Sequence, residues 1–284
     1  MSRPPAGSRV LLFTALAMMA FAANSLLCRL ALKHTAIDAG SFTSVRLVAG
    51  ALALALLERL REGRAPKSGD WPAAWALFAY AACFSWAYVS LPASTGALLL
   101  FGAVQVTMIG YGLWRGERLS PRQIIGLLAA IAGLVWLLLP GVEVPSWQGS
   151  ALMLCSGVAW GVYSLRGRGA GDPLGMTAGN FWRAGVLALG ASAMLMPWAS
   201  IDRAGLAYAV ASGAIASGVG YAIWYTALRG LTATAAASVQ LSVPALAALG
   251  AVVWLDEAIT LNLMLASAVI LGGVALVVMG RASR

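Results

Sequence analysis

Long apolar segments recur along almost the whole chain, and they constrain its fold more than any other feature. An α-helix needs about 20 mostly apolar residues to cross a bilayer, and segments such as 126–139 and 261–279 are apolar on every side. With 61% hydrophobic and 10% charged residues, the 284-residue chain has too few polar side chains to coat a water-soluble globule. Barrel strands would instead alternate polar and apolar residues. The sequence therefore predicts an all-α integral membrane protein.

Ten segments are predicted to form transmembrane helices. Their approximate ranges are 10–31, 41–57, 72–90, 93–114, 121–139, 147–166, 176–198, 204–228, 232–255 and 261–280. The start of the chain can also be read as a cleaved signal peptide, because Arg3 and Arg9 precede an apolar run with small residues near position 20. We expect a core helix instead, since the run continues to Leu32.

Basic residues are distributed unequally between the loops that connect these helices. If the N-terminus is cytoplasmic, fourteen Lys and Arg residues lie on the cytoplasmic side and only Lys33 and Arg203 lie in the opposite loops. This asymmetry follows the positive-inside rule, and it accounts for the net charge of +9 without a nucleic-acid partner. We therefore expect a multi-pass protein of the inner (cytoplasmic) membrane, surrounded by the lipid bilayer, with both termini cytoplasmic.

The two halves of the chain resemble each other. With a shift of about 140 residues the last third of each half matches without gaps, and the matched pairs are Gly110 with Gly250, Trp114 with Trp254, Glu117 with Glu257 and Gly133 with Gly273, among others. Earlier in each half, Arg46 falls on Arg183. We predict two repeats, residues 1–140 and 141–284, that form one transport domain. Because each repeat has five helices, an odd number, the second is inverted in the membrane, as is typical of secondary transporters.

Two short motifs connect the repeats to a known family. Residues 114–133, which begin Trp-Arg-Gly-Glu-Arg-Leu-Ser, and residues 254–260, Trp-Leu-Asp-Glu-Ala-Ile-Thr, resemble the drug/metabolite transporter superfamily, specifically the ten-helix EamA-type exporters. The resemblance extends over about residues 10–280. Within the family, the chain is similar to the aromatic amino acid exporters. It implies a cavity lined by helices 1, 3, 4, 6, 8 and 9. Two departures are visible: Phe21 stands where a Trp is usual, and Asp256 replaces the Gly before Glu257.

The Gly-Glu-Ser motif itself has a structural interpretation. Ser120 is a good N-cap, Pro121 occupies the tolerated first helical position, and Gln123 completes a capping box. We therefore assign Glu117 and Glu257 to tight interhelical turns at opposite faces, rather than to a substrate site, since charged residues at helix ends need no partner in lipid.

The residues needed for enzymatic chemistry are missing. His34 is the single histidine, which excludes metalloprotease motifs with two histidines, and neither Lys33 nor Lys67 follows a glycine as a phosphate-binding loop requires. The Gly169-Ala-Gly-Asp172 stretch mimics an intramembrane protease motif, but Asp172 precedes Pro173 in a predicted loop and a second membrane aspartate is lacking. We therefore predict that the chain is not an enzyme and has neither a cofactor nor a metal site.

Polar and aromatic residues in the middle of helices are the candidates for a binding site, because transporter sites lie near the midplane at the repeat interface. The candidate substrate-binding residues are Phe21, Asn24, Tyr80, Trp86, Phe101, Gln105, Trp160, Tyr163, Tyr221, Trp224, Tyr225 and Gln240. Pro244 is a candidate hinge, since a proline inside a helix removes a backbone hydrogen bond. Trp residues at helix ends are assigned to the interfacial belt.

These observations predict a monomeric secondary transporter that exports a small-molecule metabolite by alternating access, with an aromatic or other apolar amino acid as the expected substrate. Alternatives are a carrier for another metabolite or a drug-like cation, and a membrane-embedded enzyme. A phosphorylated-sugar carrier would need a Lys or Arg deep in the cavity, whereas Arg29, Arg46 and Arg183 are expected near helix ends. Because the acidic residues and His34 lie in loops or at helix ends, we predict downhill movement without an obligatory ion.

Overall fold

A computed structural model describes residues 7–62, 68–116, 120–138, 145–167, 171–228, 231, 239–240 and 242–281. Within these ranges the elements are helical. The first half contains α1 (Gly7–His34), α2 (Ala39–Glu62), α3 (Trp71–Ser90), α4 (Ala93–Trp114) and α5 (Pro121–Leu138). The second half contains α6 (Trp147–Gly167), α7 (Pro173–Leu195), the 3₁₀ helix η1 (Met196–Trp198), α8 (Arg203–Val210), the π-helix η2 (Ala211–Val219), α9 (Gly220–Leu228), α11 (Ser242–Leu255) and α12 (Leu261–Arg281).

The lengths and composition of these helices suit a lipid bilayer. In the part of the chain that the structure describes, five helical segments are long and apolar enough to span: Ser8–His34, Ala39–Arg61, Trp71–Ser90, Ala93–Trp114 and Arg203–Ala227. Shorter apolar helices are Pro121–Gly133, Ser242–Leu255 and Leu261–Leu276. The Arg203–Ala227 segment runs through α8, η2 and α9 without a break, because Ala211 and Gly220 keep helical dihedral angles. The all-helical prediction is confirmed for the described residues.

The outer surface of the bundle is apolar. Leu52, Leu128 and Val253 are 59%, 61% and 68% exposed, although water would penalise each exposed apolar surface by about 25 cal/mol per Å². Lipid removes that penalty. Tryptophans at helix ends, Trp114 and Trp147 among them, are exposed as well, which agrees with their assignment to the interfacial belt.

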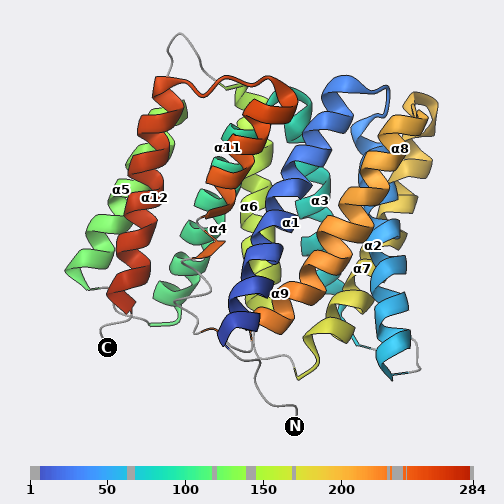
Figure 1. The fold of residues 1–284 in the computed structure, drawn as a ribbon, viewed down its shortest axis with the longest axis horizontal. Coiled ribbons are helices and arrows are strands. Elements are labelled where there is room, and N and C mark those ends of the chain that lie inside the picture. Colours follow the sequence, from blue (N-terminus) through green and yellow to red (C-terminus); the bar gives the residue numbers. More distant parts are fainter. Residues whose placement is uncertain are drawn as a thin grey trace.

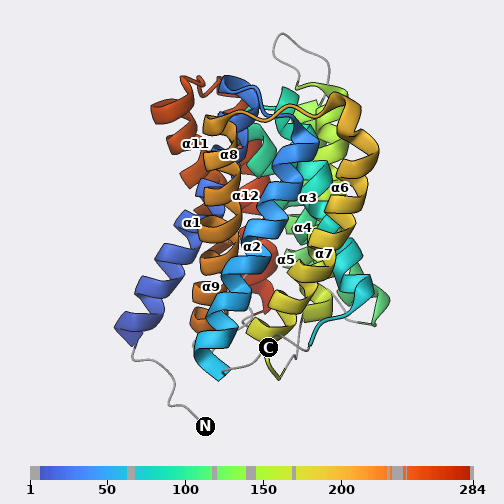
Figure 2. The same cartoon turned by 90° about the vertical axis from the view of Figure 1, so that its right-hand side faces the viewer.

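The helices of the two halves pack in matching pairs. The contact of α3 with α6 has its counterpart in that of α9 with α1, and the contact of α4 with α6 has its counterpart in that of α11 with α1. In the same way α2 packs on η2 as α7 packs on α3, while α2 with α7 and α5 with α12 join equivalent helices (Figures 1 and 2). The halves are therefore interleaved, as two repeats related by a two-fold axis would be. The predicted boundary at residues 140 and 141 lies outside the described residues.

Helix direction places the two repeat motifs on opposite sides of the bundle. We call the side on which α1 begins the N side, and the side on which it ends, at His34, the far side. The final helix α12 ends on the N side (Figure 1). The α4 helix ends on the N side and α11 ends on the far side, which is the arrangement that an odd number of helices per repeat requires. Glu117 itself lies outside the described residues.

The same backbone turn follows α4 and α11. Gly116 has φ +87° and Asp256 has φ +51°, so both lie in the left-handed region that commonly ends a helix. After α11 the Glu257 N–H donates to the Ala251 carbonyl at 3.2 Å. Glycine adopts this conformation without steric cost, and Asp is one of the few other residues that tolerate it. The glycine of the Gly-Glu motif is thus a helix cap, and Asp256 replaces it with moderate strain.

We therefore expect Asp256→Gly to raise the free energy of unfolding by about 1 kcal/mol, because glycine removes the steric penalty of a left-handed residue. Asp256→Val should lower it, since a β-branched side chain is least compatible with this backbone. Thermal unfolding of the purified variants in detergent measures both. Equal melting temperatures for the two variants would contradict the cap assignment.

The start of α5 has the predicted capping box. Ser120 N–H donates to Gln123 Oε1 at 2.8 Å, and Gln123 N–H donates to Ser120 Oγ at 3.4 Å. Small residues also let helices approach closely. A Cβ added at Gly157 would lie 2.6 Å from the Leu100 carbonyl oxygen of α4, and one added at Gly133 would lie 2.7 Å from Ile270 of α12.

Candidate functional site

A small internal cavity lies between the two halves of the chain. Its volume is about 20 Å³, and its lining residues are Phe21, Asn24 and Ser25 of α1, Tyr80 and Phe84 of α3, Leu100 and Phe101 of α4, Trp160 of α6, Ala216 of η2 and Tyr221 of α9. That volume holds about one water molecule, whereas small-molecule sites measure roughly 300–1,000 Å³. In this conformation the cavity is therefore too small to hold a small-molecule ligand.

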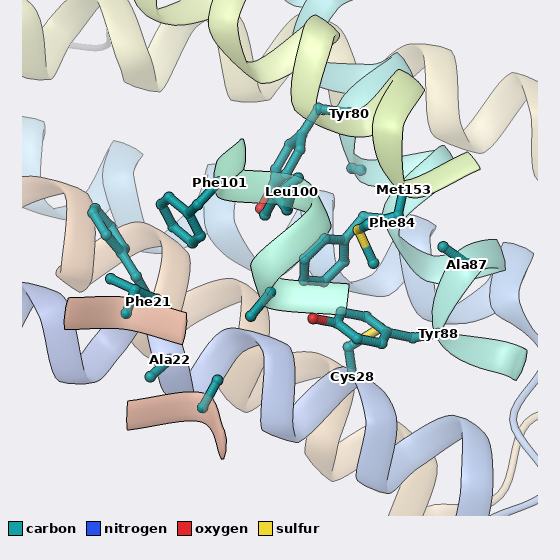
Figure 3. Close-up of a cluster of buried hydrophobic side chains, with 14 of the residues drawn as sticks. Phe21, Ala22, Cys28, Tyr80, Phe84, Ala87, Tyr88, Leu100, Phe101 and Met153 are labelled. Carbon is teal, nitrogen blue, oxygen red and sulfur yellow. The ribbon is translucent and has the colours of Figure 1, made fainter. Parts of the chain in front are cut away.

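Aromatic rings make up most of the cavity wall. The Trp160 ring has its centroid 4.8 Å from that of Tyr80, 5.2 Å from that of Tyr221 and 5.5 Å from that of Tyr163. Phe21 closes another side, with its centroid 5.8 Å from that of Tyr221. Figure 3 shows Phe21 of α1, Tyr80 and Phe84 of α3, and Phe101 of α4 gathered in one buried cluster. Such walls offer flat apolar faces with a few hydrogen-bonding tips.

A chain of hydrogen bonds runs behind the rings. Ser212 Oγ of η2 donates to Asn24 Oδ1 at 2.6 Å, and Asn24 Nδ2 donates to Tyr80 Oη at 3.2 Å. Arg46 Nη2 of α2 donates to the same Tyr80 oxygen at 2.9 Å, and Arg46 Nε donates to Ser217 Oγ at 3.4 Å. The Tyr80 hydroxyl thus accepts from two residues of the first half, and each of these is also hydrogen-bonded to a serine of the second half.

Arg46 is buried in the centre of the bundle, which corrects the expectation that the arginines inside helices lie near helix ends. Its side chain is 1% exposed, and its Cζ atom lies 4.8 Å from the Phe84 ring centroid and 5.2 Å from that of Tyr80. Cation–π attraction of this kind stabilises a desolvated guanidinium. Hydropathy predicts that α2 is a membrane helix, but it does not tell which way a polar side chain points. A basic side chain therefore lies deep in the bundle, directly behind the Tyr80 and Phe84 rings of the cavity wall.

The π-helix η2 allows the close approach of α2 at this level. A Cβ on Gly213 would overlap the Arg46 carbonyl oxygen, and one on Gly50 would lie 3.1 Å from the Gly213 carbonyl oxygen. The two helices therefore touch backbone to backbone beside the guanidinium. π-Helical stretches are rare and concentrate at functional sites, and this one supplies both Ser212 and Ser217.

The predicted site residues fall into two groups. Those that line the cavity are Phe21, Asn24, Tyr80, Phe101, Trp160 and Tyr221. Of the others, Tyr163, Trp224 and Gln105 are buried, while Tyr225 and Gln240 are half-buried. Trp224 lies behind the cavity wall, with its centroid 5.9 Å from that of Phe21. Trp86 is 38% exposed on the outer side of α3 and borders a separate surface pocket with Trp198. Substrate binding by these residues stays a prediction.

The hinge predicted at Pro244 involves residues that are only partly described. Pro244 is buried in the first turn of α11, where proline is tolerated. The preceding residues 232–238 and 241 lie outside the described part of the chain. The kink therefore stays a prediction.

The list of candidate residues omits four residues that line the cavity, Ser25, Phe84, Leu100 and Ala216. It also omits Arg46, which lies directly behind the cavity wall. Phe84 has a usable signal, because it lies four residues from Tyr80 on the same helix face. Arg46 has one too, since an ionisable residue within an apolar helix is a functional candidate by default. Ser25, Leu100 and Ala216 are indistinguishable by sequence from packing residues.

Polar contacts between the halves close the far side. Arg29 Nε of α1 is 3.1 Å from Glu257 Oε1, and the Ala93 N–H at the start of α4 donates to Glu257 Oε2 at 2.7 Å. Lys33 Nζ donates to the Leu255 carbonyl at 2.9 Å. Glu257 lies in the predicted turn, but it is largely buried and paired, because the turn docks on the opposite repeat rather than facing lipid headgroups.

We expect Glu257→Gln to lower the free energy of unfolding by about 1–3 kcal/mol, because it leaves a buried guanidinium without its counter-charge. Asp256→Asn is the matched control, since its carboxylate is exposed and Asn tolerates the left-handed backbone. Thermal unfolding of both variants in detergent is the measurement. A Glu257→Gln protein as stable as Asp256→Asn would show that the ion pair does not hold the far side together.

The N side is also closed by contacts between the halves. Arg61 Nη2 lies 2.7 Å from Asp172 Oδ1, and Arg166 Nη2 lies 3.1 Å from Asp70 Oδ1. Arg183 Nη1 donates to the Ser68 carbonyl at 3.1 Å. The described residues thus make polar contacts between the halves on both sides of the bundle, with a cavity of about 20 Å³ between them.

Comparison with known proteins agrees with this architecture. Residues 8–139 and 147–279 each match the EamA-like transporter family. The chain is 58% identical over 282 residues to an uncharacterized protein of Pseudomonas aeruginosa, which covers 97% of this chain and 98% of that protein. It is 30% identical over 224 residues to a protein of Streptantibioticus cattleyicolor named as a probable terminal-alkyne amino-acid exporter, with coverage of 75% and 74%. A solved structure described as "Crystal structure of protein" shares the fold, with a TM-score of 0.69, 21% identity, and coverage of 96% and 98%.

Proposed function

Because this chain belongs to the EamA-like transporter family, we propose that it is a ten-helix secondary transporter that exports amino acids with aromatic or other apolar side chains by alternating access. Family membership makes it a multi-pass membrane transporter. The substrate class and the direction of transport are the proposal.

The cavity between the two halves is the observation that carries this proposal. Residues of α1, α3 and α4 face residues of α6, η2 and α9 across it, so movement of one half against the other changes its size and its exposure. Inverted repeats work in this way, since two similar halves can exchange shapes around a fixed central site. The ion pairs at the two ends, such as Arg29 with Glu257 and Arg61 with Asp172, would break at one end at a time, so that the cavity opens to one side of the membrane and then to the other.

The lining supports an apolar amino acid. Trp160, Tyr80 and Tyr221 present flat ring faces, and Asn24 adds a polar group, so the wall combines apolar area with a few hydrogen-bonding positions. The Streptantibioticus relative named as a probable amino-acid exporter is consistent with this substrate class. A drug-like cation is the alternative that the same rings favour, through cation–π contact.

Transport of labelled amino acids into liposomes tests the proposal. Purified protein is reconstituted and counterflow of phenylalanine, leucine and a polar amino acid is measured, with empty liposomes as the control. We expect counterflow of phenylalanine and leucine that is independent of a pH or sodium gradient. Concentrative uptake driven by either gradient would contradict downhill transport, and the absence of counterflow for every amino acid would contradict the substrate class. Chemical analysis of the vesicle contents distinguishes a carrier, which leaves its substrate unchanged, from an enzyme.

The proposed orientation, with both termini in the cytoplasm, predicts which side of the membrane each repeat motif faces. The native cysteines Cys28, Cys83 and Cys155 are unpaired and are replaced by alanine. Single cysteines are then introduced at Arg115 and Ile259, both exposed, and treated in intact cells with an impermeant thiol reagent. We expect labelling at position 259 alone. Labelling of both positions would contradict the inverted repeat, and labelling of position 115 alone would reverse the orientation.

A further inference from the structure

We propose that Arg46 and Tyr80 form the binding point for a carboxylate group on the transported molecule. This inference rests on the proposed transport function and names a chemical feature that its substrates share. The two side chains come from α2 and α3, and both belong to the wall of the central cavity or lie directly behind it.

The first observation is that Arg46 is a buried cation without an anion. In the residues that the structure describes, its hydrogen bonds go to the neutral hydroxyls of Tyr80 and Ser217, and its Nη1 group is buried with no partner. A desolvated charge is costly unless it is paired, so the site lacks one negative group.

The second observation is the state of the Tyr80 hydroxyl. Its oxygen accepts one hydrogen bond from Asn24 Nδ2 and one from Arg46 Nη2, which occupies both lone pairs. The hydroxyl proton therefore remains to be donated, and a bond from a cation to the oxygen makes that proton a better donor. Tyr80 lines the cavity, so the strengthened donor and the free guanidinium N–H belong to one small region.

The third observation is an asymmetry between the repeats. Arg183 falls on Arg46 when the halves are aligned, yet Arg183 donates to the carbonyl oxygens of Ser68 and Gly179 near the N side. The Nη1 group of Arg183 thus donates to backbone, which is a structural contact. Arg46 has no backbone acceptor in the described part of the chain, and only its position faces the rings of the cavity.

The size of the charge favours a carboxylate over a phosphate. One guanidinium matches a single negative charge, and in the described residues Arg46 is the basic side chain in contact with the cavity wall. A phosphate monoester carries close to two negative charges at neutral pH. The rest of the wall is aromatic and apolar, which suits the side chain of an apolar amino acid once its carboxylate is bound to Arg46 and Tyr80.

Two probes that share a phenyl ring and differ in the sign of their charge, together with a sugar phosphate, test the proposal. Wild-type protein is purified, and its stabilisation against thermal unfolding is measured with 3-phenylpropanoate, with phenylethylamine and with glucose 6-phosphate, since a ligand that binds the folded state raises the melting temperature. The same three compounds are tested as inhibitors of phenylalanine counterflow in liposomes. We expect 3-phenylpropanoate to act at concentrations at least about tenfold lower than phenylethylamine, the effect of a charge-assisted hydrogen bond.

Variants assign that preference to the two residues. Arg46→Gln and Tyr80→Phe should each abolish the preference for the carboxylate probe, and Arg46→Lys should restore part of it. Tyr80→Phe keeps the ring and removes only the hydroxyl, so it tests the proposal even if Arg46→Gln does not fold. Arg183→Gln is the control and should keep the full preference.

The outcomes separate this proposal from the proposed function. If phenylalanine moves and Arg46→Gln and Tyr80→Phe still prefer 3-phenylpropanoate, the carboxylate site is wrong while transport stands. If no amino acid moves but carboxylate stabilisation depends on Arg46, the site is supported and the amino acid assignment fails. Preference for glucose 6-phosphate or for phenylethylamine in the wild type would overturn the carboxylate site.

Discussion

Replacing Trp160 by alanine is expected to lower the rate of phenylalanine counterflow at least about tenfold, because the Trp160 ring contacts three other rings and each aromatic contact contributes about 0.5–1.5 kcal/mol. The indole lies between Tyr80 of α3, Tyr221 of α9 and Tyr163 of its own helix. Its removal would leave the cavity wall without its central element. The measurement is counterflow in liposomes that contain equal amounts of each protein.

Two further tryptophans make this result specific. Trp182 is 59% exposed on α7, so Trp182→Ala should transport at the wild-type rate. Trp224 does not line the cavity but supports Phe21 from behind, and Trp224→Ala should have a smaller effect than Trp160→Ala. Normal transport by the Trp160→Ala protein would exclude the cavity as the substrate site.

Replacing Gly213 by alanine should destabilise the protein by about 3 kcal/mol or more, at the upper end of what overpacking costs. The new methyl group would overlap the backbone of Arg46, and a backbone atom cannot turn away as a flexible side chain can. The α2 helix and η2 must then separate, which also pulls apart Arg46 and Ser217. The measurements are thermal unfolding in detergent and the yield of monodisperse protein.

Gly190→Ala is the matched control for Gly213→Ala. Gly190 lies inside α7 with no atom within 4 Å of an added Cβ, so alanine there should be neutral or stabilise the helix by up to about 1 kcal/mol. Equal stability of the Gly190 and Gly213 variants would show that α2 and η2 do not pack backbone to backbone.

Much of the fold could be predicted from the sequence because apolar segments and caps are local signals. The helix predicted at 93–114 coincides with α4, and the one predicted at 204–228 differs by one residue from the combined α8, η2 and α9. The capping box at Ser120 and Gln123 was predictable for the same reason. The π-helical stretch in η2 was not, since it depends on contacts with α2 that no local pattern encodes.

The candidate site could be predicted only in part. Aromatic and amide side chains in mid-helix stand out, and several of them line the cavity. It is harder to predict which way each side chain points around the helix axis, because in lipid both faces of a helix are apolar and the periodicity of the sequence is weak. The sequence therefore does not indicate that Trp86 is 38% exposed and borders a surface pocket, or that the Arg46 side chain is buried. The partner of Glu257 comes from Arg29 in the other repeat, which one segment alone cannot indicate.

The small volume of the cavity limits how much water can stand inside the bundle. The cavity holds about one water molecule. One molecule cannot form the continuous chain of hydrogen-bonded waters along which protons would move through the cavity. A copy of the protein held in this conformation is therefore expected not to conduct protons through this cavity, whatever gradient the membrane carries.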